Sequence, residues 1–143
     1  MKKIVLLILT IFLFLPIQSN AADVAHPELN RINAKALKQL IDKKGEFILI
    51  DSRDSEKYNN GHIKGAVNIH FDPEGDPNVL NMSLMALPMD KLLIVYCDSK
   101  DEKISAGLAL DLYNMGCSKD KLKILSGGIS QWRKSGYPVT AGQ

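Results

Sequence analysis

Two short runs of consecutive apolar residues place the strongest constraint on how this chain can fold. They are FILI at 47–50 and LLIVY at 92–96, and neither alternates apolar with polar positions. A strand exposed on one face shows such alternation, whereas a strand of a parallel sheet covered on both faces is apolar throughout. The sequence therefore predicts a parallel sheet that is buried on both sides.

Helical patterns alternate with strand-like segments along the chain. Further strand candidates are AVNI at 66–69 and LKIL at 122–125. The segments with helical character are 34–45, 54–60, 105–116 and 128–136. We expect Asn33 to cap the first helix, and a loop with a short helix at 72–89, which contains three prolines. The alternation predicts one α/β domain with a mostly parallel sheet and right-handed crossovers.

The first 21 residues have the pattern of an export signal. Lys2 and Lys3 precede twelve apolar or nearly apolar residues at 4–15, and a small-residue motif ends at Ala21. We expect cleavage after Ala21, which leaves a domain at 22–143 in the periplasm. The alternative is an uncleaved membrane anchor. Twelve helical residues rise only about 18 Å, too little to cross a bilayer, so we expect no membrane span after cleavage.

The net charge and the positions of the histidines argue against nucleic-acid binding and against a metal site. The formal net charge of +2 includes Lys2 and Lys3, so the domain that remains after cleavage is formally neutral. No basic tract is long enough to predict a nucleic-acid partner. His26 and His70 have no metal-ligand spacing with either cysteine, and the sequence predicts neither a metal site nor a cofactor.

The two cysteines are expected to have different roles. A helix over 105–115 would span about 15 Å, whereas the Cα atoms of a disulfide lie within about 7 Å, so Cys97 and Cys117 are not expected to pair. Cys117 follows Gly116, a candidate residue for the helix C-terminus, and we expect it to pack in the core.

Cys97 follows the apolar run at 92–96, at the carboxyl end of a predicted strand. Ligands of parallel sheets gather at that end. We expect Ser105 to cap the next helix, so that backbone N–H groups and the helix dipole stabilise a thiolate. The other interpretation of Cys97 is a buried structural thiol, since free cysteine is often found inside proteins.

Three segments in the same order resemble the signatures of the rhodanese family. They are DSRDSEKYNNGHIKGAVNI at 51–69, the pair Tyr96-Cys97, and LSGGISQWRKSGYPV at 125–139. The resemblance begins near Ile32 and covers essentially the rest of the chain. It implies a small α/β domain with about five strands in a mainly parallel sheet flanked by helices, in agreement with the pattern described above.

The resemblance implies sulfurtransferase chemistry with Cys97 as the catalytic nucleophile. Sulfane sulfur would pass from a small donor, such as thiosulfate or a persulfide, through a Cys97 persulfide to a thiol, a protein acceptor or another nucleophile. The following loop would bind substrate as a cradle of backbone amides. Its residues are Asp98, Ser99, Lys100, Asp101, Glu102, Lys103, Ile104 and Ser105.

The loop departs from the common family pattern C-x-x-G-x-R-S. The serine stands eight positions after the cysteine rather than six, Lys100 occupies the glycine position and Glu102 the arginine position. We expect the acidic side chains of the loop to point outward to water. Carboxylates near the sulfur would still disfavour a thiolate and repel a dianion, so thiosulfate is less expected than persulfide chemistry.

The same loop can be compared with what two other functions would require. A dual-specificity phosphatase would have the pattern H-C-x5-R, and the chain has Tyr96 before the cysteine and no loop arginine, which argues against phosphoryl chemistry. The remaining alternative is a catalytically weak rhodanese-like module of the cell envelope, whose acidic loop binds a protein partner.

Several polar and aromatic residues are predicted to support structure rather than catalysis. Asp51 and Arg53 should form a buried ion pair that orders neighbouring loops. We expect His62 to bond backbone near its turn and Trp132 to pack in the core. The pair Gly127-Gly128 predicts a tight turn into the last helix.

Overall fold

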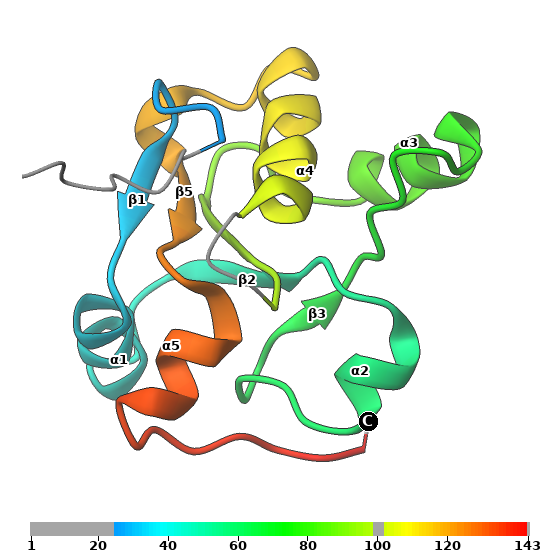
Figure 1. Cartoon of the computed structure of the whole chain (residues 1–143). Coiled ribbons are helices and arrows are strands. Elements are labelled where there is room, and N and C mark those ends of the chain that lie inside the picture. The colour runs from blue at the N-terminus through cyan, green and yellow to red at the C-terminus, as the bar shows by residue number, and fades with distance from the viewer. Residues whose placement is uncertain (1–24, 99–101, 143) are drawn as a thin grey trace, which may run out of the picture.

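The computed structural model describes residues 25–98 and 102–142, and these residues form an alternating α/β domain (Figure 1). The strands are β1 (Asn30–Ile32), β2 (Phe47–Asp51), β3 (Val67–Asn68), β4 (Leu92–Tyr96) and β5 (Leu122–Leu125). The helices are α1 (Ala34–Asp42), α2 (Ser55–Asn59), α3 (Pro77–Met85), α4 (Lys103–Asn114), α5 (Gly128–Lys134) and the 3₁₀ turn η1 (Lys119–Lys121). The expected signal segment at 1–21 lies outside the described residues.

The five strands form one sheet in the order β1-β5-β4-β2-β3, and every strand pair is parallel. The two apolar runs became the adjacent inner strands β2 and β4, which confirms the predicted parallel sheet. The observed strands differ from the predicted ones in two places. The edge strand β1 is three residues long and was not predicted, and β3 is shorter than the 66–69 segment because only Val67 and Asn68 pair with β2.

The two faces of the sheet are covered by different helices. Along β4, Leu93 and Val95 belong to one core cluster with residues of α3 and α4, while Ile94 and Tyr96 belong to a second cluster with residues of α1 and α5. Figure 1 shows α1 and α5 together, away from α4. Because β4 is covered on both faces, its end lies deep in the domain.

Within residues 25–98 and 102–142, no helix combines the length and the apolar character that a membrane span requires.

The start of α4 differs from the prediction. Asn33 does cap α1, where its side chain accepts a hydrogen bond from the Ala36 N–H. Ser105, however, is not an N-cap, because α4 begins at Lys103 and Glu102 occupies the cap position with a left-handed φ of 55°. Inside the helix the Ser105 hydroxyl donates to the carbonyl of Glu102 at 3.1 Å, a common bond for serine in a helical turn.

Trp132 provides a direct test of this packing. Its side chain is 1% exposed and its indole N–H donates to the Pro138 carbonyl at 2.9 Å. Trp132→Ala should lower the free energy of unfolding by about 3–5 kcal/mol, because it leaves a cavity and an unpaired carbonyl. Urea unfolding measures this loss. Tyr113→Ala, at a residue 41% exposed on α4, should cost less than about 1 kcal/mol, and equal losses for the two variants would contradict this packing.

Candidate active site

Cys97 lies immediately after β4, and the residue is only 2% exposed. Its Sγ is 3.3 Å from the hydroxyl oxygen of Ser105, in the first turn of α4. That oxygen can accept from the thiol while its own hydrogen is donated to Glu102, and after thiol deprotonation the hydroxyl can turn and donate to sulfur. The site therefore holds a hydroxyl group suited to both protonation states of the sulfur.

The start of α5 fixes the backbone of Cys97. The Ile129 N–H donates to the Cys97 carbonyl at 2.9 Å. A Cβ atom at Gly128 would lie only 2.2 Å from that carbonyl oxygen, and both Gly127 and Gly128 have positive φ. The two glycines form the predicted tight turn, and the close approach of the two backbones explains why a side chain at Gly128 would displace Cys97.

A buried ion pair lies next to this strand end, as predicted. Arg53 donates to both carboxylate oxygens of Asp51, at 2.9 and 2.6 Å, and also to the Gly61 carbonyl at 2.9 Å. Burial by itself would lower the pKa of Arg53, but the hydrogen bonds and charge of Asp51 outweigh burial and raise it. Arg53 therefore remains a fixed positive charge beside the site.

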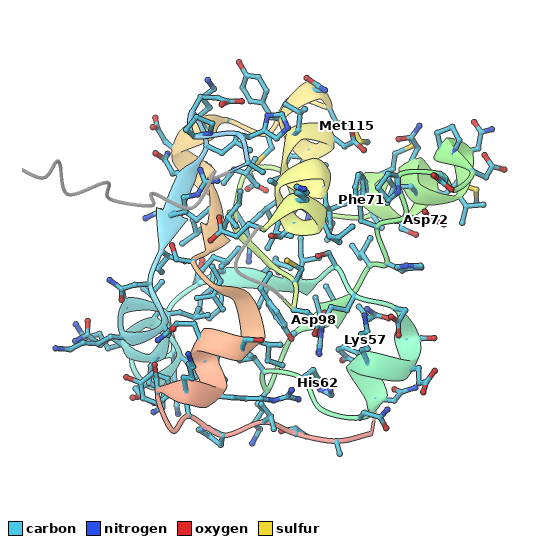
Figure 2. The ribbon with its side chains drawn as sticks, viewed as in Figure 1. Lys57, His62, Phe71, Asp72, Asp98 and Met115 are labelled. Carbon is cyan, nitrogen blue, oxygen red and sulfur yellow. The ribbon has the colours of Figure 1, made fainter. Side chains whose placement is uncertain are left out.

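Asp98 connects two cations at the mouth of the site. One carboxylate oxygen accepts from Arg53 at 3.2 Å and the other lies 3.0 Å from the ammonium group of Lys57. Figure 2 shows the labelled side chains of Lys57 and Asp98 next to each other. The hydrogen bond that Lys57 donates to Asp98 and the negative charge of Asp98 raise the pKa of Lys57, with a further contribution from Asp54. Lys57 is more than half exposed, so this pair is accessible to water.

Glu102 does not point outward to water, which corrects the expectation for this acidic side chain. It is buried, and its carboxylate accepts from the Arg31 Nε at 3.1 Å and from the Gly127 N–H at 3.0 Å. Arg31 also donates to the carbonyl groups of Ala25, His26 and Leu29. No local motif indicated this role for Arg31, because it lies 71 residues from Glu102 and only the sheet brings them together.

A pocket of about 130 Å³ lies next to the ion pairs of Arg53 and Lys57. Its walls are Ser52, Arg53, Asp54, Lys57, His70, Phe71 and Ile104. Ser52 donates to the carbonyl of Tyr96, the residue before Cys97, and Ile104 precedes Ser105. Two of the lining residues, Ser52 and Ile104, thus neighbour residues that lie beside Cys97, while Cys97 itself is not among the residues that line the pocket.

The predicted cradle is only partly described. Ser99, Lys100 and Asp101 lie outside the described residues, so the amide cradle around sulfur stays a prediction. Lys103 is exposed and Ile104 half-buried in the first turn of α4.

His62 and Cys117 have structural surroundings. The His62 Nδ1 is 3.0 Å from the Tyr58 carbonyl, its ring stacks on Tyr58 at 3.9 Å, and its backbone pairs with Thr140. Cys117 is buried in the core cluster on the α4 face of the sheet, and burial raises the pKa of its thiol. Both Cys97 and Cys117 are free thiols. The reactivity of Cys97 stays a prediction, and the surroundings of Cys117 agree with the packing role expected for it.

Comparison with known proteins gives a consistent picture. The family model described as "Rhodanese-like domain" matches residues 33–135. Mouse M-phase inducer phosphatase 1 is 28% identical over 90 residues, which cover 59% of this chain and 18% of the phosphatase. The chain therefore spans less than a fifth of that relative.

Solved structures extend the likeness to about four fifths of the chain. A Bacillus halodurans protein superposes with a TM-score of 0.68 at 26% identity, covering 78% of this chain and 77% of that protein. The thiosulfate sulfurtransferase of Pseudomonas aeruginosa gives a TM-score of 0.65 at 22% identity, covering 81% of this chain and 21% of that enzyme. At that identity the second likeness is one of fold.

The buried carboxylate of Glu102 leads to a stability prediction. Glu102→Ala leaves the Arg31 guanidinium and the Gly127 N–H without this acceptor, and should lower the free energy of unfolding by about 3 kcal/mol. Glu102→Gly removes the same contacts but relieves the left-handed backbone, and should lose about 1 kcal/mol less. Urea unfolding measures both, with Glu56→Ala on exposed α2 as control. A Glu102→Ala loss no larger than that of the control would show that the ion pair is dispensable.

Proposed function

Because this chain belongs to the rhodanese-like domain family, we propose that it is a sulfurtransferase that carries sulfur as a persulfide on Cys97. The observation that supports this most directly is the 3.3 Å contact between the Cys97 Sγ and the Ser105 hydroxyl at the start of α4. A thiolate formed there would have a hydrogen-bond donor and the N-terminal end of a twelve-residue helix beside it.

The proposed reaction has two displacement steps. In the first, the Cys97 thiolate attacks the outer sulfur of a donor R–S–SH, the donor S–S bond breaks, and R–S⁻ leaves with the electron pair as Cys97–S–SH forms. In the second, an acceptor thiolate R′–S⁻ attacks the outer sulfur of this persulfide. R′–S–SH leaves and the Cys97 thiolate is restored, so neither step needs an external oxidant or reductant.

Phosphoryl transfer is supported less well, although a phosphatase is among the similar proteins. A phosphate ester requires cations that clamp its oxygens, and arginine supplies them best. Between Cys97 and Ser105 the sequence contains no arginine, and Glu102, at the position expected for one, is itself paired with Arg31. The proposed alternative to an enzyme is a catalytically weak module that binds a protein through the same loop.

We propose further that the protein works in the periplasm, after export directed by residues 1–21. The support is the sequence pattern of two lysines, a short apolar segment and a small-residue motif. An acceptor thiol there would need protection from oxidation, so a thiol-bearing protein that is kept reduced is the acceptor we favour.

Persulfide formation is the decisive test. After incubation with a persulfide donor, intact-mass spectrometry of the folded protein should show a gain of about 32 Da, one sulfur atom. Cys97→Ser should abolish this gain, whereas Cys117→Ser should retain it, because Cys117 belongs to the apolar core cluster and burial raises the pKa of its thiol. A folded wild-type protein that gains no sulfur from thiosulfate or from persulfide donors would favour the binding module.

Ser105 should influence the rate rather than the existence of the adduct. Ser105→Ala removes the hydroxyl that lies against sulfur, and should slow persulfide formation by about tenfold, the effect of one hydrogen bond to a charged group. Stopped-flow measurement of adduct formation gives the rate. The matched control is Ser135→Ala at the exposed end of α5, which makes the same chemical change away from the site. Equal rates for the two variants would exclude a role for the Ser105 hydroxyl.

A further inference from the structure

The pocket near Cys97 lies next to an unusual cluster of charges. Two cationic side chains, those of Arg53 and Lys57, line this pocket. Arg53 is bonded to Asp51 and Asp98, and Lys57 lies 3.4 Å from Asp54 and 3.0 Å from Asp98. Three carboxylates thus share two cations, which gives this cluster a formal charge of −1.

Asp98 is the member that joins the two ion pairs. Its carboxylate uses one oxygen for Arg53 and the other for Lys57, and it directly follows the nucleophile in the sequence. Its side chain is 40% exposed and that of Lys57 is 56% exposed, so both are accessible from solvent. The backbone holds this position, because the Ser130 hydroxyl donates to the Asp98 carbonyl at 2.5 Å.

We propose that Asp98 determines donor specificity by occupying the cations that an anionic donor would need. An oxyanion entering the pocket has to displace a carboxylate from Lys57 or Arg53 and remain beside a cluster that is already negative. A donor with an ammonium group is attracted by the same cluster, since it can approach the carboxylates of Asp98 and Asp54. The preferred donors are therefore persulfides of amino thiols or of peptides that carry positive charge near the cysteine, and thiosulfate is a poor donor.

This inference rests on the proposed sulfur transfer and can fail separately from it. The probes are two donors of equal length, cysteamine persulfide with an ammonium group and 3-mercaptopropionate persulfide with a carboxylate. For each, the second-order rate of the mass gain at Cys97 is measured, and the ratio of the two rates is compared between variants. Each ratio is divided by the ratio that the same two donors give with free cysteine in solution, so that intrinsic differences in donor reactivity cancel.

The wild-type protein should load sulfur from the ammonium donor about tenfold faster than from the carboxylate donor. This is the size of effect that a cluster with a charge of −1, partly screened by water and salt, should have on donors of opposite charge. Asp98→Asn keeps the shape and a hydrogen-bond acceptor but removes the charge, and should reduce the ratio to about twofold. Lys57→Gln removes a cation and should increase the ratio above that of the wild type. The two variants act in opposite directions, so a general loss of folding cannot imitate both results.

Asp42→Asn is the matched control, because Asp42 is an exposed aspartate paired with Lys38 on α1, and it should leave the ratio unchanged. A wild-type protein that loads equally well from both donors would overturn the role of Asp98, and so would an Asp98→Asn ratio equal to that of the wild type. Failure of the wild type to load from either donor would instead overturn the proposed sulfur transfer, and the specificity inference with it.

Discussion

The guanidinium group of Arg53 is the interaction on which the geometry of the site depends. It bonds to Asp51 at the end of β2, to the Gly61 carbonyl in the loop before β3, and to Asp98 just after β4. One planar cation with five donors can satisfy three such partners at once, which a lysine ammonium in the same place could not do with comparable geometry. Arg53 thus holds together the ends of two central strands and the loop that follows α2.

The acidic residues that follow the nucleophile act in two different ways. Glu102 is buried, where Arg31 balances its charge and the Gly127 N–H uses its second oxygen, so it joins the start of α4 to the start of α5. Asp98 stays near the surface and pairs with Lys57 and Arg53. Counting charges along the loop treats these residues as equivalent, whereas the structure gives Glu102 a positioning role and pairs Asp98 with two cations of the pocket wall.

Much of the fold could be predicted because the patterns are local and strong. Continuous apolar runs led to β2 and β4, and Asn33 marked the start of α1. The edge strand β1 was missed because its three residues carry too little pattern and pair only with β5, more than ninety residues away. Ser105 was predicted to cap α4 because serine favours the N-cap position, but Glu102, with a left-handed backbone, occupies that position instead.

The sequence by itself determined the parallel α/β architecture, the identity of the candidate nucleophile and the tight turn at Gly127-Gly128. These follow from periodicity, from residue type and from the space that a Cβ atom requires. Only the tertiary structure decided which charges meet, because Arg31 and Glu102, or Lys57 and Asp98, are far apart along the chain and come together through the order of strands in the sheet. Electrostatic pairing depends on distance in space, which no local pattern of residues encodes.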